Sequence, residues 1–241
     1  METSALYKEI IADPLHWEEN KIVIGDGNTA VEYFEDEIED ISTNYGAFGG
    51  STLTIGAAVM GQCTAVLRRE GISAAQFSQE IGRGARVRPY VRVVDSQGNT
   101  SEWLQQGDYN VDTRDAAAWS SKMTLFCVDK MQRAEADYPS TSHSWPYRDI
   151  RVVEEIATAM GVEIDPITYT VMNKSYLIQL PTAYSMRETL SYIAAMYGGN
   201  FIITKSGKLL LLTLGSLPES THYLLNETGY RLVVGGVRIL V

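Results

Sequence analysis

Short runs of β-branched and apolar residues, separated by turn-forming residues, dominate the sequence up to about residue 130. Such runs are too short for packed helices, but antiparallel strands need only a few residues and a tight turn. The spacing predicts a meander of at least six strands that rolls into a barrel or stacks as a sandwich. The runs are 22–24, 31–33, 52–55, 62–67, 85–94, 101–104, 109–111 and 123–128.

A cluster of turn and cap residues at 138–146 marks a change from strand to helical periodicity. Apolar residues then recur at helical spacing over 150–160, which predicts an amphipathic helix. A second helix is predicted over 185–197, because Ser185 and Glu188 match a capping box. Strands are predicted at 176–180, 201–204 and 209–214.

The predicted fold class is α+β, mainly β. Four segments are expected. Residues 1–19 form an N-terminal helical segment, and 20–137 form a β-barrel domain. Residues 147–215 form a small α-β-α-β-β domain, and in 216–241 the chain returns to strands.

Acidic residues are concentrated near the N-terminus. The chain has 30 acidic and 20 basic residues and a formal net charge of -10, and 12 of the acids lie within residues 1–50. Six of them form a cluster over 32–40 that would repel a nucleic-acid backbone, so sequence-specific nucleic-acid binding is not expected. The cluster fits either a charged strand edge that blocks unwanted pairing or a specific acidic interface.

Apolar stretches are short, and cysteines are few. A spanning helix needs roughly 20 apolar residues, so no membrane span is expected. The N-terminal residues lack a basic and apolar signal pattern, so a cleaved signal is not expected. Cys63 and Cys127 lie in separate apolar runs and are predicted to be two buried thiols.

Sequence patterns of known catalytic sites are incomplete. A pair of glycines at 56 and 61 has P-loop spacing, but Gln62 and Cys63 stand where Lys and Ser or Thr would bind phosphate and magnesium. The three histidines are far apart and match no metal-ligand spacing. We therefore predict no enzymatic activity and assign no catalytic residue, cofactor or metal ligand.

Within the run 85–94, residues 86–93 place three arginines on one face of a strand and valines on the other. Pro89 within it is typical of an edge strand or a bulge. The arginines form either a solvated face or an interface that meets the acidic cluster, in the same chain or in a neighbouring copy of a ring. The candidate subunit interface consists of charged residues of both signs: Glu35, Glu37, Glu39, Arg86, Arg88 and Arg92.

Several short turn and packing motifs occur in a fixed order. In the first part they are 54–56, 84–87, 101–103, 107–111 and 129–131, and in the second part 149–161, 185–195 and 198–209. In this order they resemble the tail hub proteins of phages and phage-like particles, the baseplate-hub or late control protein D family. In that family the helix-containing piece is inserted between two related barrels.

The resemblance implies a structural role. Three copies would form a ring at the distal tail that joins the tail tube and the tape-measure protein to the tip, spike or fibres. The expected partners are two further copies of the chain, a distal tail or tube protein, a tape-measure protein and a spike or fibre protein. The expected location is the virion's distal tail, after assembly in the host bacterial cytoplasm.

The sequence departs from the family pattern near its end. Family members usually continue after the strand that resembles 233–239 and complete a second barrel, whereas this sequence ends at Val241. Residues 216–241 are therefore expected to be the start of an incomplete second barrel.

Two other functions stay open at the level of sequence. Trp103, Trp119 and Trp145 could stack on sugars, which would suit a carbohydrate-binding tail adhesin. The chain could also be the non-catalytic N-terminal part of a tail-associated cell-wall hydrolase.

Overall fold

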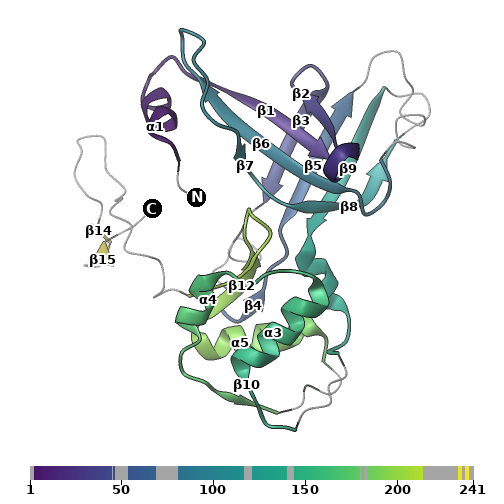
Figure 1. The fold of residues 1–241 in the computed structure, drawn as a ribbon, viewed down its shortest axis with the longest axis vertical. Coiled ribbons are helices and arrows are strands. Elements are labelled where there is room, and N and C mark those ends of the chain that lie inside the picture. The colour runs from purple at the N-terminus through teal and green to yellow at the C-terminus, as the bar shows by residue number, and fades with distance from the viewer. Residues whose placement is uncertain are drawn as a thin grey trace.

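The computed structural model forms two units, a rolled β-sheet and an α+β unit, which lie one above the other in Figure 1. The predicted fold class, α+β and mainly β, is confirmed. The residues that the structure describes are 3–44, 46, 54–68, 81–116, 121–139, 144–179, 181, 184–213 and the strand backbone at 233–234 and 237–238.

The first unit is a strongly curved sheet of eight antiparallel strands. They are β1 (Trp17–Ile24), β2 (Val31–Phe34), β3 (Ile38–Asn44), β5 (Gln62–Arg68), β6 (Arg86–Val94), β7 (Leu104–Gln105), β8 (Tyr109–Asp115) and β9 (Lys122–Asp129). The strand order is β2-β1-β6-β8-β9-β5-β3, with β7 added beside β6, so β2 and β3 are the two ends. Alternate residues face inward and share one buried core, which includes Ile22, Leu67, Val87, Tyr109 and Leu125.

Pro89 does not lie at an edge, because β6 is a central strand. It pairs with Ile22 of β1 on one side. On the other side Val87 pairs with β8 and Tyr90 pairs with β7, so Pro89 stands where the neighbouring strand changes. A residue without an N–H fits a gap in the ladder as well as it fits an edge.

The N-terminal helix α1 (Ala5–Ile11) packs beside the rolled sheet. Ser4 caps it by accepting a hydrogen bond from the Tyr7 amide, and Ser4 also binds the Glu102 carboxylate through its own amide at 2.7 Å. Ile10 is its one buried residue. Because β1 begins at Trp17, the last three residues of the predicted helical segment 1–19 belong to the sheet.

The second unit places three helices around a small sheet. The helices are α3 (Asp149–Met160), α4 (Pro166–Val171) and α5 (Met186–Tyr197), and the strands are β4 (Ala57–Ala58), β10 (Tyr147–Arg148), β11 (Leu177–Ile178), β12 (Gly199–Ile203) and β13 (Leu209–Thr213). The sheet has the order β13-β12-β4, and β10 pairs with β11. Its core is separate from that of the rolled sheet and includes Val153, Ile156, Leu190, Phe201 and Leu211.

Local signals explain both long helices. Ser185 and Glu188 form both hydrogen bonds of the predicted capping box at the start of α5. Gly161 and Gly198 end α3 and α5 in the left-handed conformation, with φ of 66° and 65°. Helix α4 was not predicted, although Asp165 caps it and a proline opens it.

Strand β4 differs from the prediction of a strand at 52–55. Thr54 and Ile55 lie in no strand, and residues 52 and 53 lie outside the described part of the chain. Gly56, at φ 85°, turns the chain against α5, where an added Cβ would lie 2.7 Å from the Cβ of Ala195. The chain then runs parallel to β12 for two residues and continues into β5, so it links the two units.

A short 3₁₀ helix, η1 (Gly27–Thr29), connects β1 to β2, and another, η2 (Lys130–Glu135), follows β9. Near the C-terminus β14 (Val233–Val234) pairs antiparallel with β15 (Val237–Arg238), and the rest of the segment 216–241, where the chain is expected to return to strands, lies outside the described residues. Within the described part of the chain, every helix falls short of the length and apolarity needed to span a membrane.

Both thiols are expected to resist modification in the folded protein. Cys63 and Cys127 face each other across β5 and β9 and are free and buried, as predicted. Burial raises the pKa of Cys63 to about 12, and burial together with the neighbouring Cys63 raises the pKa of Cys127 still further. A thiol reagent at pH 8 should therefore label neither cysteine until denaturant is added, whereas rapid labelling of the native chain would contradict this burial.

Candidate subunit interface

The acidic cluster lies at the two ends of the rolled sheet. Glu32 is in β2, Glu35 and Glu37 are in the turn that follows, and Glu39 and Asp40 are in β3. The pairing of β3 with β5 also shifts register between Ile38 and Asp40. Charges and bulges both discourage a second chain from pairing with a free strand edge, so the cluster lies where a charged edge is useful.

Only part of this cluster is paired within the chain. Glu32 binds Lys21 at 3.0 Å, Glu39 binds Lys122, and Glu35 accepts a hydrogen bond from the Asn20 amide. In contrast, the carboxylates of Asp36, Glu37 and Asp40 make no hydrogen bond or ion pair with the described residues. The excess negative charge of the sheet is therefore concentrated at the turn from β2 to β3.

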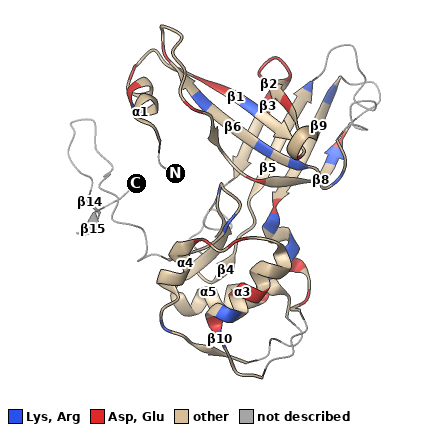
Figure 2. Ribbon diagram, in the orientation of Figure 1, with Lys and Arg blue, Asp and Glu red and all other residues tan. Residues whose placement is uncertain are grey.

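The arginines of β6 alternate with buried residues such as Val87 and Val93, so they share the outer face of the strand; the sequence predicts that they share one face. Figure 2 shows basic positions in blue along β6. Arg92 binds Glu19 at 2.6 Å and lies over the Trp103 ring, 4.5 Å from its centroid. Arg88 donates to the Gly25 carbonyl at 3.1 Å, and no carboxylate among the described residues binds it.

Arg86 is bound by two carboxylates from its own chain. Its guanidinium donates two hydrogen bonds to Asp108, at 2.5 and 2.8 Å, and pairs with Asp26 at 3.0 Å. Within one chain the three arginines therefore do not contact Glu35, Glu37 or Glu39. The predicted interface between the two groups of charges is not formed inside a single copy.

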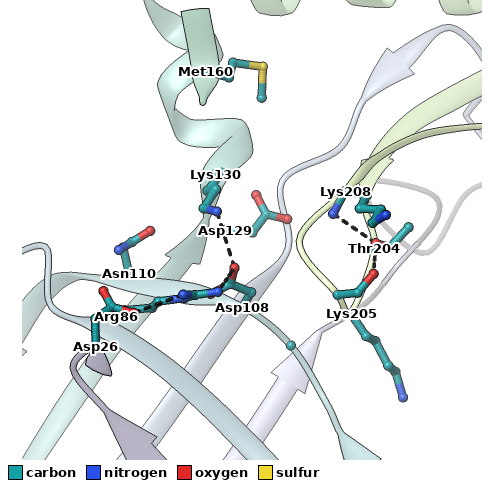
Figure 3. A network of polar contacts seen from close by, with 12 residues as sticks. Asp26, Arg86, Asp108, Asn110, Asp129, Lys130, Met160, Thr204, Lys205 and Lys208 are labelled. Atoms are coloured by element: carbon teal, nitrogen blue, oxygen red, sulfur yellow. Dashed lines mark hydrogen bonds and ion pairs between the residues drawn. The ribbon is translucent and has the colours of Figure 1, made fainter. Parts of the chain in front are cut away.

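Asp108 is the centre of a polar network between the two units (Figure 3). It is 2% exposed and also pairs with Lys130 at 3.4 Å. Burial alone would raise the pKa of Asp108, but the hydrogen bonds and charge of Arg86, with the charge of Lys130, outweigh burial and hold it below its usual range. The turn between β12 and β13 packs against the same carboxylate, because a Cβ on Gly207 would lie 2.7 Å from Asp108 Oδ2.

Two further contacts cross the junction near Asp108. The side-chain amide of Gln105 donates to the Lys205 carbonyl at 2.8 Å, and Lys205 Nζ donates to Gln106 Oε1 at 2.5 Å. The hairpin of the α+β unit thus packs against the Asp108 carboxylate and is hydrogen-bonded to Gln105 of β7 and to Gln106 of the loop before β8. Sequence reasoning missed this junction, because Asp108 was noted only as part of a packing motif.

Asp129 fixes the chain where the rolled sheet passes into η2. Its carboxylate accepts hydrogen bonds from the Gly61 amide at 2.7 Å and from the Met131 amide at 2.8 Å. Burial raises the pKa of Asp129 to about 6, although these two bonds and the charge of Arg187 act in the opposite direction. Both connections between the units, at Gly61 and at η2, therefore meet at one buried acid.

We expect Asp129 to titrate near pH 6 when its carboxyl carbon is followed by NMR. The folded pKa of Asp129 is higher than its ordinary value of 3.8, so the folded state favours the protonated carboxyl. The stabilisation by Asp129 is therefore complete below pH 3.8 and is lost as the pH rises through 6. The variant Asp129→Asn should lack this part of the pH dependence. A midpoint at the ordinary value would contradict the burial of this carboxylate.

The two described candidates, Trp103 and Trp145, do not form an open sugar-binding platform. Trp145 packs against the core of the α+β unit and makes edge contacts with Tyr138 and Tyr147. The ring of Trp103 has Lys21 Nζ 5.0 Å and Arg92 4.5 Å from its centroid, so cations already lie over it. Trp119, the third candidate, lies outside the described residues.

The described residues contain no group of three or more His, Cys, Asp or Glu side chains that could hold a metal ion. The stretch with P-loop glycine spacing forms β4 and the start of β5, whereas a phosphate-binding loop leads into a helix. The described part of the structure thus offers charged surfaces and a polar junction between its two units.

Comparison with known proteins relates this fold to a phage tail. No protein-family model matches the chain, and no curated protein matches it. Among solved structures it is similar to the 43 kDa tail protein of prophage MuSo2 from Shewanella oneidensis, with a TM-score of 0.54 and 14% sequence identity. The match covers 86% of this chain but 58% of that protein. The chain therefore has the fold of part of a prophage tail protein and spans less than two thirds of its length.

Proposed function

We propose that the chain is a structural component of a phage or phage-like tail, at its distal end in the virion. The observation that carries this proposal is the fold shared with a prophage tail protein over 86% of the chain. The hub resemblance of the sequence motifs agrees with it. In this role three copies form a ring that joins the tail tube and the tape-measure protein to the tip, spike or fibres.

The charges of the rolled sheet support assembly into a ring. At one end of the sheet, the carboxylates of Asp36, Glu37 and Asp40 bind no cation among the described residues. On β6, the Arg88 guanidinium binds no carboxylate among them. Because these groups do not meet within one chain, a contact between copies would join different surfaces of the two molecules. Such heterologous contacts close into rings when the rotation between copies permits it.

The junction between the two units supports a role in force transmission. Asp108 and Asp129 each bind groups from separate segments of the chain, and both are buried. A component between a tail tube and a tip must hold its parts in a fixed orientation under load. Two buried, hydrogen-bonded acids at the connection suit that requirement.

Native mass spectrometry of the purified chain, over a range of protein concentrations, tests the ring. We expect a species of three copies, and the variant Arg88→Glu should raise its dissociation constant about tenfold, because like charges would then face each other. The matched control is Arg83→Glu, since the Arg83 side chain is 79% exposed and lies before β6. Arg92 is unsuitable because it holds Glu19 and Trp103.

Equal weakening by both variants would mean that net charge alone, and not the β6 face, controls assembly. If Arg88→Glu left the trimer unaffected, Arg88 would not be part of the subunit interface.

A further inference from the structure

On the outer face formed by β3, β5, β9 and β8, the two middle strands, β5 and β9, carry no charge over three successive rows. Directly opposed residues form rows across these four strands, and side chains in one row share one face. The two central rows are Ser42, Thr64, Phe126 and Thr113, and Asn44, Gln62, Val128 and Asn110. The next row, Asp40, Val66, Thr124 and Asp115, has acids only on its two outer strands.

Phe126 lies in the middle of this face and is 46% exposed. Its direct neighbours across the strands are Thr64 and Thr113, which cannot cover an aromatic ring. The outer faces of β1 and β6 differ, because they carry charged residues such as Lys21 and Arg92. An exposed aromatic residue surrounded by few charged side chains is typical of the centre of a protein interface.

The charges next to this face point to a second copy of the same chain as its occupant. Asp40 borders the face directly, and Asp36 and Glu37 lie in the turn before β3. These three acids have no cation among the described residues, and Arg88 on the outer face of β6 has no carboxylate among them. One molecule thus carries both halves of a complementary pair on separate surfaces, and a second copy can join them.

We infer that the β3-β5-β9-β8 face of one copy packs against the β6 face of the next, with Phe126 at the centre of the contact and Arg88 opposite the acidic edge. This inference rests on the proposed ring. It adds the surface that the sequence did not indicate, since the predicted interface contained only charged residues. The uncharged centre supplies the affinity, and the acidic edge with Arg88 sets the orientation.

The test compares Phe126→Thr and Phe126→Asp with the control Tyr192→Thr in the full chain, by sedimentation velocity over a range of concentrations. Tyr192 is 58% exposed on α5, so the control removes an exposed aromatic side chain from the other unit. Both Phe126 variants should raise the dissociation constant of self-association at least about tenfold. The control should leave it unchanged, and thermal unfolding of Phe126→Thr should stay within a few degrees of the parent, because threonine suits a strand.

Self-association unaffected by either Phe126 variant would overturn this inference and leave the ring to another surface. A chain that stays monomeric at all concentrations would also overturn it, since a second copy is the stated occupant. In both cases the tail role itself is judged separately, by where the protein lies in the particle. Loss of association in all three variants would show an effect of exposed aromatic area in general, and would likewise contradict a specific role for Phe126.

Discussion

Replacing Asp108 with alanine is expected to lower the free energy of unfolding by about 3 kcal/mol, because it leaves Arg86 and Lys130 beside an emptied, buried position. The carboxylate is 2% exposed and accepts two hydrogen bonds from Arg86. Since the Arg86 side chain is 32% exposed, the cost lies at the lower end of the range for a fully buried pair. Chemical denaturation of both proteins at neutral pH measures the difference.

Asp26→Ala is the matched control for Asp108→Ala. Asp26 binds the same guanidinium at 3.0 Å, but its side chain is 67% exposed. Its loss should change the unfolding free energy by less than about 0.5 kcal/mol, as for most surface ion pairs. Equal effects of the two substitutions would show that Asp108 is not the buried centre of this network.

The pH dependence of Asp108 should be opposite to that of Asp129. Because its folded pKa lies below the ordinary value of 3.8, the stability from this pair is present above 3.8 and is lost as the pH falls through the lower folded pKa. The difference in unfolding free energy between the parent and Asp108→Ala should therefore shrink in acid. A difference that grows in acid would contradict the pairing with Arg86.

Gly199→Ala is expected to destabilise the α+β unit by about 3 kcal/mol, as overpacking against backbone does. An added Cβ would overlap the carbonyl oxygen of Leu212 and lie 2.7 Å from Thr213 Cγ2. Since the backbone of β13 cannot move away without breaking its pairing with β12, the strain stays in the sheet. Thermal and denaturant unfolding of the variant measure it.

The adjacent Gly198→Ala provides the control. Gly198 ends α5 at φ 65°, and an added Cβ would meet no atom within 4 Å. Gly198→Ala should therefore lower the unfolding free energy by about 1 kcal/mol, because alanine is strained in a left-handed backbone conformation. If Gly198→Ala proved the more damaging of the two, the close approach of Gly199 to β13 would be wrong.

This pair of glycines shows what the sequence could predict. The sequence predicts a helix over 185–197, which stops directly before this dipeptide, and Gly198 does cap the end of α5. The role of Gly199 depends on Leu212 and Thr213, which come close only after the hairpin folds. Capping boxes and helix ends are predictable because their partners lie within a few residues of each other.

The junction between the two units could not be predicted, because its partners are far apart in the sequence and meet only in the folded chain. Strand β4 lies beside β12 across a sequence separation of 143 residues, measured from Ala57 to Asn200. Likewise Asp108 is 22 residues from Arg86 and meets a turn of the other unit at Gly207. The sequence identified the strand face that carries Arg86, Arg88 and Arg92, but it did not show that two of these arginines bind acids in their own chain.

The proposed tail role rests on fold and surface together. The fold of the chain is similar to that of part of a prophage tail protein. In the proposed ring, the complementary charges and the exposed Phe126 contact a neighbouring copy. The variants at Arg88 and at Phe126 test these two surfaces independently.

The most direct test of the proposed role is immunogold electron microscopy of purified particles from the source organism, with antibody raised against the 241-residue chain. We predict gold at the distal end of the tail. Gold along fibres would instead favour the adhesin. Particles that stay unlabelled, also after they are broken so that internal antigen is accessible, would contradict a structural role in the tail.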